Sequence, residues 1–161
     1  TGATEAGREI ARRLTGEGFR DGNEAVALYV KDRTEQSDIR RNVLSHSHIL
    51  SSRFDLSTYA YQCAQGLSFE EVRNAHDYSK ILLPDVTFLF DVSMENVEKR
   101  LFGRGEKKEF FEDLAFLAKV REKYLEAYEK LKNERDIRLI DANGSPEETF
   151  EAVRSVIDSL S

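Results

Sequence analysis

The sequence predicts an α/β fold in which a parallel sheet is flanked by helices. Residues 84–92 are apolar on both faces, which is typical of a central parallel strand, and residues 137–142 form a second candidate strand. Helical patterns precede, separate and follow these two segments, and strands that alternate with helices indicate a parallel sheet. The chain of 161 residues is long enough for one core, and we expect residues 1–161 to form a single domain.

The first half of the chain is predicted to be mainly helical. Apolar residues that recur one helical turn apart indicate amphipathic helices, and glycines between these patterns mark their ends. The expected helices are residues 5–14, 24–44, 55–65 and 68–80. Ile49 and Leu50 form a short apolar run that predicts a brief strand after the second helix. Ser68 and Glu71 have the spacing of a capping box for the fourth helix.

The second half of the chain alternates strands with helices. Ser93 is expected to cap the helix that follows the first strand, and Pro146 stands at the first position of the last helix. The expected elements are strand 84–92, helix 94–102, helix 111–131, strand 137–142 and a final helix from residue 146. With the short run near residue 50, three candidate strands are visible, which is few for a sheet of this class.

Charge and composition exclude several classes of protein. Thirty acidic residues against 24 basic ones give a net charge of −6, which argues against nucleic-acid binding and against a basic membrane-surface face. No apolar run approaches the about 18 residues that a membrane span needs, so we expect no membrane partner. Cys63 is the single cysteine, which excludes an internal disulfide and indicates a reducing compartment. We therefore expect a cytoplasmic protein.

Acidic residues stand at the carboxyl ends of the two longer strands. Asp91 lies near the end of the first strand and Asp141 near the end of the second. In open α/β sheets, ligands bind at this edge. The simpler alternative is that each carboxylate caps the turn after its strand, which is the commoner role for either residue taken alone.

Arginines and aromatic residues surround a helix–strand–helix unit. Tyr29 lies one turn before Arg33 on the same helix face, and Arg53 follows the short strand, ahead of a segment with hydroxyls and two tyrosines. An arginine fork binds phosphate oxygens in a bidentate manner, and a tyrosine ring can stack on a base. These residues suit a nucleotide. The alternative, with equal weight from spacing alone, is a core helix in which Arg33 pairs with Asp32 or Glu35.

A charged, glycine-bearing stretch at residues 103–109 suits a loop that closes over a polyphosphate and stabilises charge during phosphoryl transfer. The basic residues of this stretch and of the helix before it are Arg100, Arg104, Lys107 and Lys108. The alternative is a solvated surface loop, as most short charge runs are. A true phosphate loop is not visible, because the Gly2-to-Gly7 spacing is followed by Arg8-Glu9 instead of Lys and Ser or Thr.

The three histidines do not have the spacing of a metal site. His46 and His48 lie in a loop without an acidic or cysteine partner at ligand spacing, and His76 stands alone on a helix. The sequence also has no nucleophile elbow for a Ser/His/Asp arrangement. We therefore expect no metal ion held by a protein side-chain cluster.

Several segments resemble the thymidylate kinase family. Residues 52–62 read S-R-F-D-L-S-T-Y-A-Y-Q, and residues 84–92 read P-D-V-T-F-L-F-D-V. The further segments that resemble the family are residues 2–14, 120–126, 140–142 and 146–148. The likeness spans essentially the whole chain in the family's order. It implies a P-loop nucleoside-monophosphate-kinase fold that moves the γ-phosphoryl group of ATP to dTMP with Mg²⁺.

The resemblance implies how the chain would bind dTMP. By position, Tyr29 would stack on the thymine ring, and Arg33 would reach the base and the phosphate side. Arg53 would hold the phosphate and act in catalysis, and Tyr61 would pack against the deoxyribose and disfavour a 2′-hydroxyl. Further polar contacts to the nucleotide are implied for Thr58 and Gln62.

The resemblance also implies how the chain would bind ATP. Arg100 and Arg104 match the lid, at about residues 103–110, that closes over ATP, and Arg104 would take part in catalysis. Asn143 and Gly144 lie near the expected position of the adenine. Members of this family are commonly homodimers, and we expect the same here.

The chain departs from the family pattern at three places. The family's first strand with its phosphate loop, and its second strand, are missing ahead of Thr1, so we expect the natural polypeptide to be longer at its N-terminus. Ser52 stands where the family has an acidic residue on the Mg²⁺ side, and Glu109 stands where many bacterial members have a lid arginine. One alternative is therefore a nucleotide-binding protein without catalysis. Another is a kinase for a different deoxynucleotide, because Tyr29 and Thr58 are not the commonest family choices.

Overall fold

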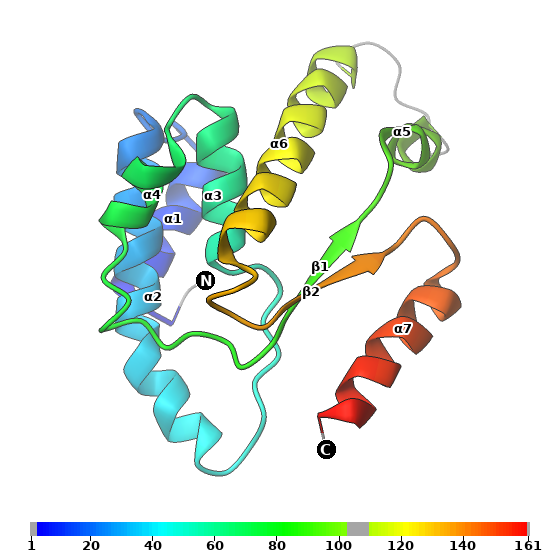
Figure 1. The fold of residues 1–161 in the computed structure, drawn as a ribbon. Coiled ribbons are helices and arrows are strands. Elements are labelled where there is room, and N and C mark those ends of the chain that lie inside the picture. The colour runs from blue at the N-terminus through cyan, green and yellow to red at the C-terminus, as the bar shows by residue number, and fades with distance from the viewer. Residues whose placement is uncertain (1–2, 103–109, 161) are drawn as a thin grey trace. The chain divides into compact units, whose positions relative to one another are not determined.

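The computed structural model describes residues 3–102 and 110–160 (Figure 1). The chain divides into two compact units, Thr1–Pro84 and Asp85–Ser161, and each is described by itself. That the two units form the single domain expected from the length stays a prediction. None of the described helices is both long and apolar enough to span a bilayer.

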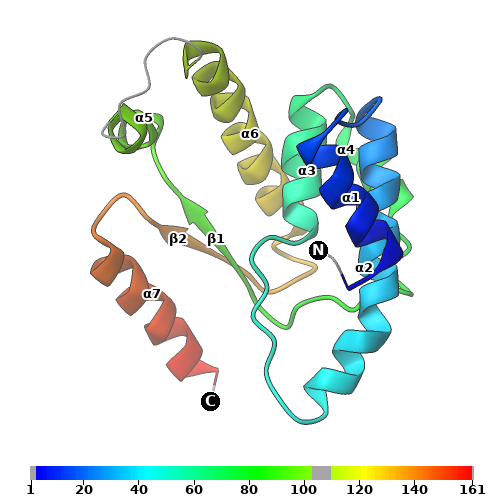
Figure 2. The ribbon, with the colours of Figure 1, turned by 180° about the vertical axis from the view of Figure 1, so that it is seen from behind.

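The first unit is a cluster of helices, as the sequence predicts. Its elements are α1 (Glu5–Thr15), α2 (Gly22–Leu44), α3 (Asp55–Ala64) and α4 (Phe69–Ala75). The long helix α2 packs against α1, α3 and α4 (Figure 2). Ile10, Tyr59 and Val72 are fully buried between these helices and form the centre of the core. The capping box of Ser68 and Glu71 is confirmed at the start of α4.

Two predictions for this unit are wrong. Residues 49–50 do not form a strand, and the Leu50 side chain is 98% exposed, because no described strand lies beside this segment to pair with it. The fourth helix ends at Ala75 instead of Lys80. His76 leaves the helical conformation (φ −91°, ψ 118°), and the buried side chain of this residue lies in the core.

The second unit contains the parallel sheet. Its elements are β1 (Thr87–Asp91), α5 (Met94–Phe102), α6 (Phe110–Leu131), β2 (Ile137–Asp141) and α7 (Pro146–Ser159). β1 and β2 pair in parallel with Thr87 opposite Ile137, which confirms the predicted strand direction. α7 packs against β2, as Figure 1 shows. The expected burial of both faces of β1 is incomplete, because Phe90 is 50% exposed.

The helix starts of this unit agree with the sequence. Ser93 Oγ accepts a hydrogen bond from the Asn96 backbone N–H (3.3 Å), so Ser93 caps α5 as expected. Pro146 stands in the first turn of α7, which also has a capping box between Ser145 and Glu148. Since a parallel strand pair ends at one edge, β1 and β2 deliver Asp91 and Asp141 to the same edge of the sheet.

Candidate functional site

A buried arginine organises the candidate site in the first unit. Arg33, on α2, donates hydrogen bonds from Nη2 to Thr58 Oγ1 (2.7 Å) and to the Phe54 carbonyl oxygen (3.0 Å). The guanidinium carbon lies 5.7 Å from the centre of the Tyr29 ring and 5.4 Å from that of Phe54. The predicted neighbourhood of Tyr29, Arg33 and Thr58 is therefore formed, with α2 and α3 supplying the side chains.

The partners of Arg33 are not the carboxylates that the simpler alternative requires. Asp32 instead accepts a hydrogen bond from Gln36 Nε2 (2.6 Å), and Glu35 forms an ion pair with Lys31 (3.7 Å). Burial lowers the pKa of the Arg33 guanidinium, which nevertheless stays charged because an arginine pKa starts so high. A buried cation that is hydrogen-bonded to neutral oxygens suits a polar or anionic ligand.

Arg53 stands next to this group in a strained backbone conformation. Its φ is +67°, in the left-handed region, which costs an L-residue with a side chain about 1–2 kcal/mol. Its guanidinium carbon lies 5.2 Å from the centre of the Tyr61 ring, and Nη2 donates to Tyr61 Oη at 3.4 Å. Such strain persists where the surrounding structure holds it and is common at functional sites. The exposed Arg53 side chain remains accessible to a ligand.

The position of Arg53 directly precedes the start of α3. Phe54, at the N-cap position, makes no side-chain capping hydrogen bond. The N-terminus of a helix carries free backbone N–H groups and a partial positive charge, both of which favour an anion. Arg53 and this helix start therefore place two kinds of phosphate-binding group side by side in the sequence.

Tyr29 links the two arginines of the site. Burial raises the pKa of the Tyr29 phenol, whereas the charges of Arg33 and Arg53 lower it, and Tyr61 also acts on it. All three residues thus lie close enough to Tyr29 to affect it electrostatically. The structure brings together these four residues, which the sequence selects from positions 29 to 61.

Gln62 contributes a buried amide whose oxygen has no hydrogen-bond partner among the described residues. It lies one turn after Thr58 on α3, and both side chains are buried. Gln62 Nε2 donates a long hydrogen bond to Gln65 Oε1 (3.4 Å), while Gln62 Oε1 is buried and has no hydrogen-bond partner among the described residues. Buried polar atoms are almost always satisfied, so the unpaired acceptor of Gln62, one turn after the Thr58 that contacts Arg33, is a candidate ligand contact.

The second unit fixes a loop at the carboxyl end of its sheet. Arg100 Nη2 donates hydrogen bonds to the carbonyl oxygens of Ala142 (2.8 Å) and Gly144 (3.1 Å). Asn143 Oδ1 accepts hydrogen bonds from the Ser93 backbone N–H (2.8 Å) and from Asn96 Nδ2 (3.0 Å). Arg100 and Asn143, both selected from the sequence, therefore lie together. We name residues 142–144 the β2 loop.

The strand-end carboxylates differ in their roles. Asp141 accepts hydrogen bonds from the backbone N–H and Nδ2 of Asn143 (2.9 and 2.6 Å), so the simpler prediction of a turn cap is confirmed there. Asp91 instead forms a two-pronged ion pair with Arg121 of α6 (2.6 and 2.8 Å), and this hydrogen bonding raises the pKa of Arg121. Sequence reasoning missed this pair, because no spacing pattern links residues 30 positions apart.

Nearly all of the predicted lid lies outside the described residues. Arg104, with the basic residues Lys107 and Lys108 and the acidic Glu109, lies outside the described residues. Their expected part in closing over ATP therefore stays a prediction.

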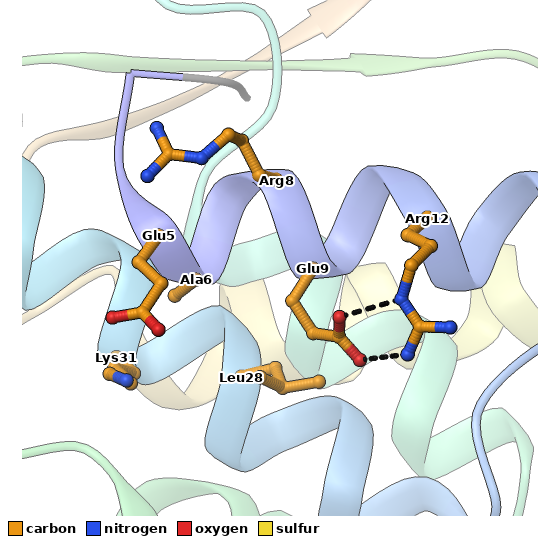
Figure 3. Close-up of a pocket in the computed structure, with 7 residues that line it drawn as sticks. All are labelled: Glu5, Ala6, Arg8, Glu9, Arg12, Leu28 and Lys31. Atoms are coloured by element: carbon orange, nitrogen blue, oxygen red, sulfur yellow. Dashed lines mark hydrogen bonds and ion pairs between the residues drawn. The ribbon is translucent and has the colours of Figure 1, made fainter.

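A separate hollow of about 380 Å³ lies between α1 and α2 and contains none of the predicted site residues (Figure 3). Its lining residues are Glu5, Ala6, Arg8, Glu9, Arg12, Leu28 and Lys31. Arg12 donates two hydrogen bonds to Glu9 (2.8 and 2.6 Å), which Figure 3 shows as dashed lines, and Arg13 donates a third (2.9 Å). These contacts, with Arg12 first, lower the pKa of Glu9 to about 2. Arg12 and Glu9 thus neutralise each other, whereas the lining as a whole has three basic and two acidic side chains.

Replacing Arg12 with Gln is expected to raise the pKa of Glu9 from about 2 toward the ordinary 4.5, because the Arg12 hydrogen bond is the largest cause of the low value. The folded pKa lies below the unfolded one. The stabilisation from this pair is therefore present above about pH 4.5 and is lost as pH falls toward 2. An NMR titration of the Glu9 carboxyl measures the change. Arg20→Gln, which removes an ion pair with Asp21, is the control, and an unchanged pKa in Arg12→Gln would contradict the prediction.

Comparison with solved structures defines the class of fold. Thymidylate kinase from Ehrlichia chaffeensis superposes with a TM-score of 0.68 and 19% identity, and the match covers 96% of this chain and 77% of that one. Deoxyadenosine kinase from M. mycoides, solved with dCMP and dCDP, gives a TM-score of 0.58 and 13% identity over 98% of this chain and 82% of that one. The chain therefore has the P-loop fold of nucleoside and nucleotide kinases, as the sequence predicts.

Sequence comparison defines the family. The thymidylate kinase family profile matches residues 1–153. A probable thymidylate kinase from Sulfolobus acidocaldarius is 31% identical over 156 residues, which are 95% of this chain and 76% of the relative. Thymidylate kinase from Mesoplasma florum is 33% identical over 155 residues, which are 93% of this chain and 72% of the relative. The chain belongs to the thymidylate kinase family.

A shorter match shows how much of a relative this chain spans. The probable thymidylate kinase from Methanococcus maripaludis is 35% identical over 97 residues, which are 60% of this chain and 47% of the relative. The match to this chain thus covers about half the length of that relative.

Proposed function

We propose that the protein is an ATP-dependent dTMP kinase that moves the γ-phosphoryl group of ATP to dTMP and forms dTDP. The observation that carries the proposal is the buried cation of Arg33, which lies against two aromatic rings and hydrogen-bonds Thr58 of α3. This group belongs to the segments by which the chain matches its family. The proposal assigns it to the base of the acceptor nucleotide.

The chemistry of thymine suits the polar groups of this site. The edge of the ring offers one N–H donor between two carbonyl acceptors. Arg33 is a donor, and Gln62 Oε1 is a buried acceptor without a partner among the described residues. A base that satisfied both would remove the cost of leaving Gln62 unpaired. Tyr29 supplies a ring on which the base would stack.

The phosphate of dTMP is assigned to Arg53 and the start of α3. An arginine binds a phosphate through two parallel hydrogen bonds, and the partial positive charge at the start of a helix favours the same anion. Tyr61 contacts the Arg53 guanidinium and would lie beside the sugar. In this arrangement Arg53 would orient the phosphate oxygen that attacks the γ-phosphoryl group, which is a positioning contribution to the reaction.

ATP would supply the phosphoryl group. We assign the β2 loop to the binding of its adenine. Arg100 and Asn143 hold this loop through main-chain and side-chain hydrogen bonds, and the exposed Arg100 guanidinium can lie against a base. Mg²⁺ would accompany ATP, because it is usually bound through substrate phosphates and waters with one or two carboxylates. The described residues contain no group of three His, Cys, Asp or Glu suited to a metal, and Ser52 stands where the resemblance expects an acid, so no described residue is assigned to the ion. No step is therefore assigned to Mg²⁺ here.

A coupled assay of ADP formation by the full-length protein tests the proposal. With ATP and Mg²⁺ present, turnover is expected to be fastest with dTMP, in comparison with dUMP, dCMP and dGMP. If another nucleotide is turned over faster, that nucleotide is the acceptor and dTMP is not. Absence of ADP with all four would favour the alternative of nucleotide binding without catalysis, which predicts dTMP affinity that depends on Arg53. Ser52→Asp would then show whether the missing carboxylate is the cause.

Two further parts of the proposal rest on the family resemblance and on composition. We infer a homodimer, as is common in the family, and a cytoplasmic location, which the lone Cys63 favours. Light scattering on the purified full-length protein tests the first part, since a monomer at assay concentration would overturn it.

A further inference from the structure

His76 is a buried histidine of the first unit that no motif explains. It directly follows α4 and is 6% exposed. Two tyrosine rings lie nearly parallel to its imidazole, each at an angle of 9°, with ring centres 5.8 Å away for Tyr59 and 5.2 Å away for Tyr78. The imidazole is thus held in one plane by stacking.

The hydrogen-bond partners of His76 determine which ring nitrogen carries the proton. Nδ1 lies 2.7 Å from the carbonyl oxygen of Val72, which can only accept, so Nδ1 is the donor. Nε2 lies 3.4 Å from Arg33 Nη1, which can only donate, so Nε2 is the acceptor. The imidazole is therefore neutral, and the lone pair of Nε2 accepts from the arginine.

Arg33 is consequently held by acceptors on both arms of its guanidinium. Nη1 donates to His76, and Nη2 donates to Thr58 and to the Phe54 carbonyl. These acceptors come from α3, from the segment before it and from the end of α4, so they fix the guanidinium plane against rotation. Such preorganisation lowers the cost of ordering a side chain when a ligand binds.

The tyrosines that stack on His76 are themselves anchored to α3. Tyr78 Oη donates a hydrogen bond to the buried Asp55 carboxylate (3.0 Å). The hydroxyls of Tyr59 and Tyr78 are also hydrogen-bonded to each other (2.9 Å). The plane of the imidazole, and with it the direction of Nε2, is therefore tied to the same helix that presents Thr58.

We propose that His76 is a positioning residue for nucleotide recognition, whose unprotonated Nε2 orients Arg33 toward the base of the acceptor nucleotide. The inference rests on the proposed function, since it takes Arg33 to contact the base. His76 itself does not touch the substrate in this arrangement. Its loss should therefore weaken nucleotide binding and leave the phosphoryl-transfer step largely unchanged.

His76→Phe tests this role because it keeps an aromatic ring for stacking and removes the acceptor. We expect the KM for dTMP to rise about tenfold, the loss typical of one hydrogen bond to a charged group, with kcat within about twofold of the wild type. His76→Gln, whose amide oxygen restores an acceptor, should recover part of the loss. His46→Phe, at an exposed histidine, is the matched control and should leave KM unchanged. An unchanged KM in His76→Phe, or an equal loss in His76→Gln, would overturn the inference.

A double-mutant cycle separates positioning from general destabilisation. In an Arg33→Met background, His76→Phe should cause no further rise in KM, because the group that it orients is gone. A full further loss in that background would show that His76 acts independently of Arg33. If the wild type does not turn over dTMP, the proposed function fails. The same cycle is then measured from nucleotide dissociation constants by calorimetry, and an absence of coupling there overturns the inference by itself.

The tautomer of His76 can be observed without any variant. The ¹⁵N chemical shifts of the imidazole in the wild-type protein near neutral pH are expected to show a protonated Nδ1 and an unprotonated Nε2. A protonated Nε2 would overturn the inference, because the lone pair needed by Arg33 would be absent. This measurement decides the point even if the His76 variants fail to fold.

Discussion

Arg53→Met is expected to lower kcat/KM for dTMP by about 100-fold or more, because it removes a fork that would make two charge-assisted hydrogen bonds to the phosphate. Binding of thymidine, which lacks the phosphate, should be nearly unchanged. Calorimetry with both ligands and steady-state kinetics with dTMP measure the difference. An equal loss of affinity for thymidine and dTMP would contradict the assignment of Arg53 to the phosphate.

The backbone of Arg53 adds a stability test to the same position. Because its φ is +67°, a glycine there relieves strain that an alanine retains, so Arg53→Gly should be about 1 kcal/mol more stable than Arg53→Ala. Urea unfolding of the two variants measures this difference in the free energy of unfolding. If the two free energies are equal, the left-handed conformation is not strained. If Arg53→Gly has the higher free energy of unfolding, the native arginine is retained although its backbone conformation lowers stability.

Arg33→Lys is expected to lower kcat/KM for dTMP about 100-fold although it keeps the positive charge. A lysine ammonium is a compact group that cannot match a planar fork placed among acceptors on both arms. The variant should also lose about 1–3 kcal/mol of stability, because Thr58 and the Phe54 carbonyl are left with a poorer donor. In contrast to Arg53→Met, this variant should lower the binding affinity for thymidine and for dTMP by the same factor.

The matched control for this change is Arg41→Lys on the same helix. Arg41 is exposed and pairs with Asp38 (2.8 Å), and surface pairs of this kind contribute little. Its kinetics and stability should therefore match those of the wild type. If Arg33→Lys retains full activity, charge alone is sufficient and the fork geometry described for Arg33 is irrelevant to recognition.

Local patterns predicted most elements, and tertiary contacts explain where they failed. Periodicity and capping residues found the helices, since both signals lie within a few residues of each other. The run at Ile49 and Leu50 has strand composition, but a strand forms only beside a partner, and the described chain supplies none there. The early end of α4 is set by the burial of His76 among residues distant in sequence, which no local pattern records.

In the candidate site, contacts between residues close in sequence could be predicted, and contacts between distant residues could not. Tyr29 and Arg33 are one helical turn apart, so their contact follows from spacing, and the family resemblance supplied Arg53. The positive φ of Arg53 has no signal in the sequence, because the residue is not a glycine. The contact between Arg33 and His76 spans 43 positions. Nothing in the sequence around His76, which the local pattern placed on a helix, indicates such a partner.

The β2 loop has an implication for which substitutions a descendant of this chain could accept. Arg100 grips only carbonyl oxygens of the loop, which every amino acid supplies, so its hold does not depend on which side chain stands at position 142. Gly144 is different, because a Cβ there would collide with the Glu148 carboxylate that caps the start of α7. Arg100 therefore places no limit on the residue at position 142, where burial of Ala142 in the core sets the limit instead. A side chain at position 144 requires the Glu148 carboxylate to move away from its place in the capping box of α7.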